Sequence, residues 1–246
     1  DLQEKIEKVF SDPDVGAGAL HVGDVTSLAE SVLNKFYGRP FSILNEYEVA
    51  SRLSKLSSNE GLLEQFTEQF ILGEFEHVIG PWALWRYDNY RKFPRLGRVK
   101  QLREDEREAL SNLYAIFHKN CLDNDQLTSF HVFDIATSIL SERGPMFDHL
   151  VVDESQDLGP HMLRFIRSAA AMGRDDITLC GDSGQAIYNR IHSYKKNGLE
   201  VAGKSSRLHV NYRTSKQIRS LAEKITDLEV TNETAIENRS SVSRFN

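Results

Sequence analysis

The sequence predicts an α/β protein in which a parallel-sheet domain is interrupted by a mainly helical subdomain. Two observations carry this prediction. Short apolar runs alternate with amphipathic helical stretches in the first and last parts of the 246-residue chain, which is typical of strand–helix–strand units. From about residue 45 to 140, long amphipathic stretches dominate and strand signals are scarce. We therefore expect a sheet domain formed by residues 1–44 and 141–205, a helical insert at 45–140, and the start of a second domain at 206–246.

Composition restricts the class of protein. Hydrophobic residues make up 40% and charged residues 27%, which suits a globular protein with a sizeable core. The net charge of −6 argues against a protein that coats DNA with a uniformly basic surface, although one positive face is compatible with DNA binding. No apolar run reaches the length of a membrane span, no signal peptide is visible, and the two cysteines are isolated, so no membrane is expected and the expected location is cytoplasmic.

The first third of the chain contains two helix signals and one strand signal. Apolar residues at helical spacing predict a helix over residues 2–10, and residues 20–25 form a short strand candidate. Residues 27–36 predict a second helix with Leu28, Val32 and Leu33 facing inward. Within the insert, the clearest helical stretches are 62–72 and 103–120. The second of these carries an apolar face made of Leu110, Leu113, Tyr114 and Phe117.

From residue 147 the pattern returns to strands and helices. An apolar run at 150–152, a helix from about Pro160 to Met172 and a second apolar run at 177–180 predict a β–α–β unit with parallel strands. A further strand at 206–210 and a helix at about 215–228 follow.

Two adjacent carboxylates follow the first of these strands. Ligands bind at the carboxyl ends of the strands in open α/β sheets, and Asp153 and Glu154 stand there. Asp153 is suited to hold Mg²⁺, which prefers one or two carboxylates with phosphate and water. Glu154 can polarise a water for attack on a phosphate. The competing interpretation is that acidic residues after a strand serve as helix caps.

Two further segments carry polar side chains of interest. After the second strand, glycines permit a close backbone approach, and the Gln185 amide can sense a phosphate or the attacking water. An ordinary Gly-Asp turn is the alternative there. Arg213 lies between a strand and a helix, from which a guanidinium can reach a transferring phosphoryl group, or alternatively face solvent.

The three segments occur together and in order: Asp-Glu-Ser-Gln-Asp at 153–157, Gly-Asp-x-x-Gln-x-Ile-Tyr at 181–188 and Asn-Tyr-Arg-Thr at 211–214. This set resembles the superfamily 1 DNA helicases of the UvrD/Rep type. The resemblance implies a partial RecA-like (P-loop NTPase) parallel sheet with a helical insert. It implies that Asp153 is the magnesium ligand and that Glu154, Gln185 and Arg213 act on the γ-phosphate of ATP. It places further residues at the nucleotide or the single strand: Gln156, Asp157, Asp182, Tyr212 and, for DNA, Tyr188.

The chain departs from the family pattern in three places. Asn189 to His192 stand where many members have an aromatic and an arginine, and Asp24 and Thr26 replace the Thr and His of an upstream segment. A G-x-x-x-x-G-K-[ST] phosphate-binding loop is missing from the sequence. We therefore expect a fragment that alone binds ATP weakly and does not hydrolyse it.

Residues 81–107 mix aromatic and basic side chains. One interpretation is a nucleic-acid surface, in which aromatic rings stack on bases and cations contact phosphates. The other is a helical module with its tryptophans in the core. The position of the helical insert in the family favours the first, with five cations near DNA phosphates: Arg86, Arg91, Lys92, Arg95 and Arg98.

The expected function is coupling of Mg-ATP hydrolysis to movement on single-stranded or partly duplex DNA. A non-catalytic helicase-like scaffold that binds DNA or protein is one alternative, because the phosphate-binding loop is missing. The motor part of a helicase–nuclease is another.

Overall fold

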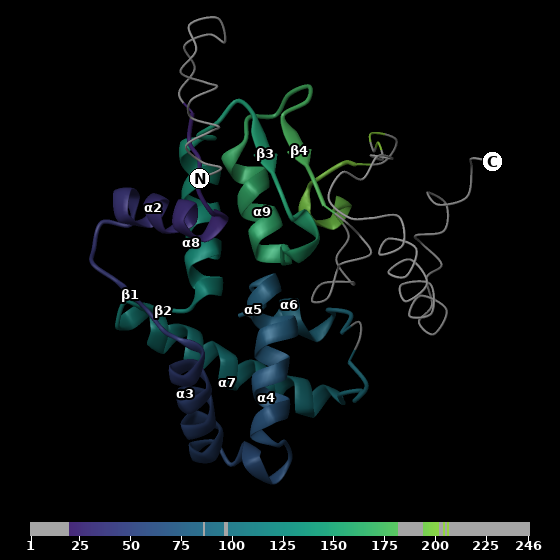
Figure 1. Cartoon of the computed structure of the whole chain (residues 1–246). Helices are drawn as coiled ribbons and strands as arrows, with labels where there is room; N and C mark the ends of the chain where they lie inside the picture. Colours follow the sequence, from purple (N-terminus) through teal and green to yellow (C-terminus); the bar gives the residue numbers. More distant parts are fainter. Residues whose placement is uncertain are drawn as a thin grey trace, which may run out of the picture. The chain divides into compact units, whose positions relative to one another are not determined.

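The computed structural model describes residues 20–85, 87–95, 98–181 and 194–201, together with 204 and 206. The described residues up to Glu200 belong to one compact unit, which combines helices with two small parallel sheets (Figure 1). Its longer elements are α2 (Val25–Phe36), α3 (Glu46–Asn59), α4 (Glu68–Glu74), α7 (Glu104–Asp123), α8 (Ser129–Arg143) and α9 (Pro160–Ala169). The strands are β1 (Ser42–Ile43), β2 (Gln126–Leu127), β3 (Leu150–Val152) and β4 (Ile177–Leu179). Shorter elements are η2 (Leu62–Glu64), the π-helical η3 (Phe75–Ile79), α5 (Gly80–Trp82), α6 (Tyr87–Arg91), η4 (Ser155–Asp157) and η6 (Lys195–Asn197).

The predicted β–α–β unit is present. Strands β3 and β4 pair in parallel, with Leu150 opposite Ile177 and Val152 opposite Leu179, and α9 connects them. Pro160 occupies the first turn of α9, where its missing N–H costs no hydrogen bond. Helix α9 of this unit packs with α2, β2 and α8 in a hydrophobic core that includes Leu33, Phe133 and Phe165.

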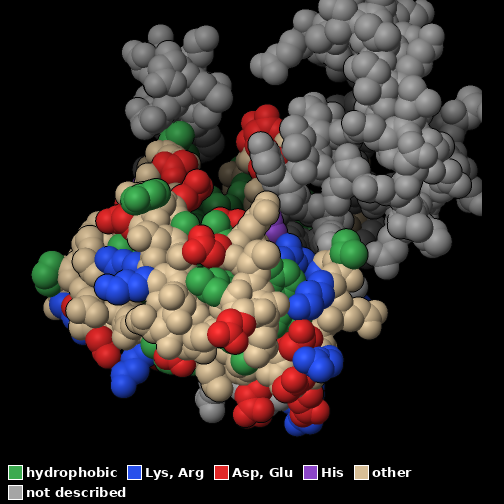
Figure 2. All heavy atoms as spheres, turned by 90° about the horizontal axis from the view of Figure 1, so that it is seen from below, with side chains coloured by type: hydrophobic (Ala, Val, Ile, Leu, Met, Phe, Trp, Pro, Cys, Tyr) green, Lys and Arg blue, Asp and Glu red, His purple; other side chains and the backbone are tan. Residues whose placement is uncertain are grey.

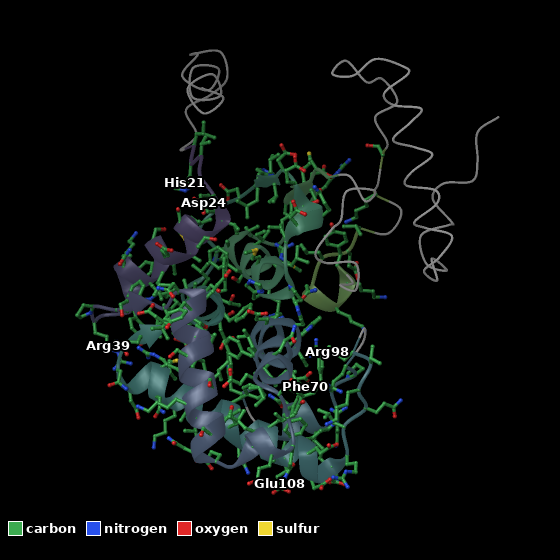
Figure 3. All side chains as sticks on the ribbon, turned by 60° about the horizontal axis from the view of Figure 1, so that its bottom comes forward. His21, Asp24, Arg39, Phe70, Arg98 and Glu108 are labelled. Carbon is green, nitrogen blue, oxygen red and sulfur yellow. The ribbon has the colours of Figure 1, made fainter. Side chains whose placement is uncertain are left out.

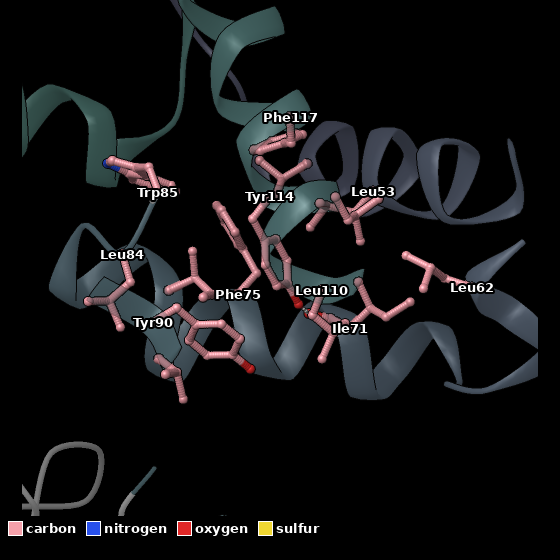
Figure 4. Packing of buried hydrophobic residues seen from close by; sticks show 14 of the residues in the cluster. Leu53, Leu62, Ile71, Phe75, Leu84, Trp85, Tyr90, Leu110, Tyr114 and Phe117 are labelled. Atoms are coloured by element: carbon pink, nitrogen blue, oxygen red, sulfur yellow. Dashed lines mark hydrogen bonds between the residues drawn. The ribbon is translucent and has the colours of Figure 1, made fainter. Parts of the chain in front are cut away.

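The insert has a hydrophobic core of its own. Phe75 meets Phe117 edge-on at 5.3 Å between ring centroids, and Tyr114 donates a hydrogen bond to the Ile71 carbonyl at 2.8 Å, so α7 is joined to the α4–η3 run (Figure 4). The inward face expected for residues 103–120 is confirmed, since its four apolar residues are all buried: Leu110, Leu113, Tyr114 and Phe117.

Two expectations about the elements differ from the structure. Residues 20–24 form no strand, because Asp24 caps α2 by accepting a hydrogen bond from the Ser27 N–H at 2.9 Å. The stretch 62–72 is broken into η2 and α4, since η2 ends at Glu64 and Thr67 begins a new helix as its N-cap. Helix α8 packs with α2 and α9, and its Phe130 also packs against the insert core. The inward face of α2 is as expected.

The chain passes between the two cores through a short parallel ribbon. Ser42 pairs with Gln126 and Ile43 with Leu127 in β1 and β2, and the Leu44 N–H adds a bond to the Leu127 carbonyl at 2.8 Å. The insert therefore begins and ends on neighbouring strands. Among the helices described, none combines the length and apolar content that crossing a membrane requires.

Candidate nucleotide site and the basic stretch of the insert

The carboxyl ends of β3 and β4 are held together beyond the last strand residues. The Cys180 N–H donates to the Val152 carbonyl at 2.7 Å, and the Ser155 N–H donates to the Cys180 carbonyl at 2.9 Å. Ser155 is buried, whereas Asp153 and Glu154 are exposed. The backbone therefore presents the two carboxylates to solvent at one edge of the sheet.

Glu154 has an unusual backbone conformation. Its φ of 50° and ψ of 38° lie in the left-handed region, which costs a residue with a Cβ about 1–2 kcal/mol. This residue turns the chain from β3 directly into η4. Strained residues concentrate at functional sites, so the conformation supports the choice of Glu154 as a reacting group.

Side-chain hydrogen bonds within the segment orient the carboxylates. The Gln156 Nε2 donates to Glu154 Oε2 at 2.6 Å, and Asp153 Oδ1 accepts from the Glu154 N–H at 2.9 Å. Asp157 lies at the end of η4 and is exposed. The structure thus brings Asp153, Glu154 and Gln156 together.

Gly181 permits the segment after β4 to approach this turn. A Cβ at position 181 would lie 2.4 Å from Gln156 Oε1 and 2.8 Å from Ser155 Oγ, distances that real Cβ atoms do not show. The close approach expected of a glycine here is confirmed. Both strand ends therefore converge on Ser155 and Gln156.

The donor set at this edge fits magnesium. Among the described residues, no three His, Cys, Asp or Glu side chains gather as ligands. Magnesium instead accepts one or two carboxylates and completes its shell with water and phosphate oxygens. An exposed Asp153 at a strand end meets that requirement.

Several predicted site residues lie outside the described residues: Arg86, Asp182, Gln185, Tyr188, Tyr212 and Arg213. The same holds for the helix expected at 2–10 and the elements expected from 206 onward. Tyr194, which the sequence did not single out, has its hydroxyl 3.5 Å from Ser155 Oγ, and no sequence signal marks it.

The basic stretch of the insert turns much of its charge inward. Glu74 is fully buried and takes Arg95 in a two-pronged pair, with Nη2 2.6 Å from Oε2 and Nε 2.5 Å from Oε1. Tyr90 also donates to Glu74 Oε1 at 2.7 Å. Burial, and then the Glu74 charge, raise the pKa of Tyr90. The Arg95 side chain is only 4% exposed and already paired, so the prediction that it contacts a DNA phosphate is wrong.

The other predicted contacts differ in exposure. Arg98 is 3.3 Å from Glu74 and lies over the Phe70 ring, 5.6 Å from its centroid, with its side chain 22% exposed (Figure 3). Arg91 is exposed and pairs with Glu104, and Lys92 is exposed. The face of the insert seen in Figure 2 intersperses acidic and basic side chains rather than gathering one sign. The cations that remain accessible are Arg91 and Lys92, and in part Arg98.

Four aromatic residues of this stretch belong to the insert core or pack against it. Trp85 is 7% exposed and Tyr90 is fully buried, while Trp82 and Phe93 pack against the same cluster. The core interpretation is therefore the correct one for these rings, and base stacking on Trp85 or Tyr90 is excluded by their burial.

One comparison with known proteins identifies a family. The family model of the UvrD/REP helicase N-terminal domain matches residues 1–196, which is more than half of the chain. No curated protein matches the chain.

Proposed function

Since the chain belongs to the UvrD/REP helicase family, we propose that it forms part of an ATP-dependent DNA helicase that couples Mg-ATP hydrolysis to movement along single-stranded DNA. The observation that carries this proposal is the convergence at one sheet edge of Asp153, Glu154, Gln156 and the close-approaching Gly181.

Each residue at that edge has a distinct proposed role. Asp153 would hold magnesium, which supplies charge neutralisation to the phosphates when bound. Glu154 accepts the proton of the attacking water, and its hydrogen bond from Gln156 keeps the carboxylate oriented. Asp157, Asp182 and Tyr212 line the nucleotide, while Gln185 and Arg213 complete the γ-phosphate surroundings in this proposal.

The proposed DNA contacts of the insert are limited to cations that solvent can reach. Arg91, Lys92 and Arg98 contribute backbone phosphate contacts from the insert, and Arg86 and Tyr188 remain proposed contacts from the sequence alone. Phosphate contacts of this kind supply affinity without base specificity.

A steady-state ATPase assay of the full-length gene product tests the proposal. We expect hydrolysis that single-stranded DNA stimulates, and we expect Glu154→Gln to lower kcat by about 10²- to 10⁴-fold, the usual contribution of a general base. Nucleotide binding should change little, because the amide keeps the size of the side chain. Asp153→Asn should instead raise the magnesium concentration needed for half-maximal rate.

Glu142→Gln is the matched control, since Glu142 is an exposed carboxylate at the end of α8. It should leave kcat and the magnesium requirement unchanged. A wild-type protein that binds DNA but hydrolyses no ATP would reject the motor and establish the non-catalytic scaffold.

A further inference from the structure

Two imidazole rings meet inside the protein where the two cores adjoin. His118 of α7 and His131 of α8 are hydrogen-bonded through Nδ1 and Nε2 at 2.9 Å. The Trp85 indole stacks on both rings, with centroid distances of 4.8 Å and 4.7 Å and interplanar angles of 6° and 7°. His131 is 1% exposed. Trp85 belongs to the insert core, whereas Val132 and Phe133, next to His131, belong to the core formed by α2, β2, α8 and α9.

The hydrogen bonds around the pair indicate which ring nitrogens donate and which accept. The Thr128 N–H donates to His131 Nδ1 at 3.2 Å, and Thr128 Oγ1 lies 2.7 Å from the same nitrogen, which makes His131 the third-position partner of a capping box at the start of α8. A nitrogen that accepts from an N–H carries no proton, so the proton of a neutral His131 is on Nε2. Nε2–H then donates to His118 Nδ1. Both rings are neutral in this arrangement.

An added proton costs the pair one of its hydrogen bonds. On His131 Nδ1 it can be donated to Thr128 Oγ1 at 2.7 Å, but the Thr128 N–H in the capping box of α8 then loses its acceptor. On His118 it would put Nδ1–H against His131 Nε2–H, unless His131 shifted its own proton to Nδ1, which again costs the Thr128 N–H its acceptor. In each case a donor at a buried position is left without its acceptor, and a hydrogen bond of the joint is lost.

The nearby Asp134 carboxylate favours a charged His118, but burial of the ring outweighs it. Asp134 of α8 accepts from Trp85 Nε1 at 3.4 Å, and burial raises its pKa. Arg164 of α9 donates to the Pro81 carbonyl at 2.9 Å and lies over the Trp82 ring. His161 of α9 packs edge-on against Phe130 and Phe133. Burial lowers the pKa of His118, and burial together with His118 lowers the pKa of His131 to about 3.

The same contacts hold the insert against the sheet domain. Gly80 lies so close to Phe130 of α8 that a Cβ would fall 2.1 Å from its ring. Arg164 and Pro81 bridge α9 and α5, and Trp85 bridges to α7 and α8. We propose that the cluster of Trp85, His118 and His131 is a proton-sensitive joint between the insert and helices α8 and α9. Protonation of the imidazole pair breaks contacts in this joint and separates the insert from the two helices.

The direction of the pH effect follows from linkage. A free histidine has a pKa of 6.5, above the values in the folded protein, so the unfolded chain binds more protons as the pH falls through 6.5. The stability contributed by the neutral pair is therefore complete above about pH 6.5 and is lost towards pH 3.

Trp85 fluorescence reports on the joint directly. The chain has two tryptophans, so Trp82→Phe in the full chain leaves Trp85 as the probe and keeps an aromatic ring at position 82. We expect a reversible change in Trp85 emission, centred below pH 6.5, while the far-ultraviolet circular dichroism still shows a folded protein. The double variant His118→Gln/His131→Gln should abolish that transition, because a glutamine amide at position 131 can still accept from the Thr128 N–H but takes up no proton.

His149→Gln is the matched control, since His149 is exposed and lies outside the joint. It should leave the transition in place. A transition that persists in the double variant, or emission that stays constant until the protein unfolds, would overturn the proposal.

Nitrogen NMR of the wild-type histidines provides a second test that needs no substitution. At pH 7 we expect His131 to be neutral with the proton on Nε2. A cationic ring on either member of the pair at pH 7 would also reject the joint.

Discussion

The sheet edge exposes its charged side chains to solvent, whereas the basic stretch of the insert buries one of its own. At the edge, β3 delivers Asp153 and Glu154 to solvent, and nearby backbone bonds keep them there. In the insert, Arg95 turns into the interior and meets the fully buried Glu74. A strand end fixes the direction of the residue that follows it, whereas a long arginine side chain goes to whichever carboxylate the packing provides.

The largest expected difference between the regions concerns stability. Glu74→Gln leaves Arg95 buried beside a neutral partner, which should lower the free energy of unfolding by about 3–5 kcal/mol in urea titrations. Glu104→Gln breaks the exposed pair with Arg91 and should cost about 1 kcal/mol or less.

The paired apolar replacement Glu74→Leu/Arg95→Met sharpens this result. It removes both charges together and should recover most of the lost stability. If Glu74→Gln stayed within about 1 kcal/mol of the wild type, Glu74 would not be the centre of a buried ion pair.

The next effect concerns geometry at the edge. Gly181→Ala forces the Gln156 amide away, because a Cβ would sit 2.4 Å from its Oε1, and so removes the support of Glu154. We expect kcat for ATP hydrolysis by the full-length gene product to fall about tenfold, with a small change in melting temperature. Gly173→Ala is the control, since no atom lies within 4 Å of a Cβ there. Equal rates for both variants would show that the close approach has no role in catalysis.

The smallest effect concerns DNA affinity. Lys92 is exposed, so Lys92→Glu should weaken binding of single-stranded DNA a few-fold and reduce the slope of log affinity against log salt by about 1–2. Lys55→Glu reverses another exposed lysine of the insert, on α3, and serves as the comparison. If the two variants had the same affinity and salt dependence, the stretch around residue 92 would have no preferred contact with DNA.

Local patterns predicted the β–α–β unit well. The apolar run at 150–152, Pro160 and the run at 177–179 each indicate their element without help from distant residues, and all three are confirmed. The inward residues of α7 follow equally from helical spacing. Convergence of Gly181 on the turn after β3 follows from the parallel pairing of the two strands.

Features that depend on tertiary packing could not be predicted from the sequence. The burial of Arg95 depends on Glu74, which lies 21 residues away in the sequence. The residues around Glu74 give no signal that its carboxylate is buried. The imidazole pair joins residues from two helices, although Thr128-x-x-His131 has the spacing of a capping box and is a usable signal in retrospect. The left-handed Glu154 likewise follows from the turn it must make, not from its residue type.

The parallel ribbon of β1 and β2 has a consequence for how such a protein is assembled. The segment from Leu44 to Asp125 leaves and rejoins the sheet domain on adjacent strands, whose separation is about 5 Å. Loop-closure entropy grows only slowly with length, so the domain bears nearly the same penalty whether that excursion is short or long. The segment can therefore differ in length at little entropic cost, provided that it keeps the contacts of Gly80, Pro81 and Trp85 with α8 and α9.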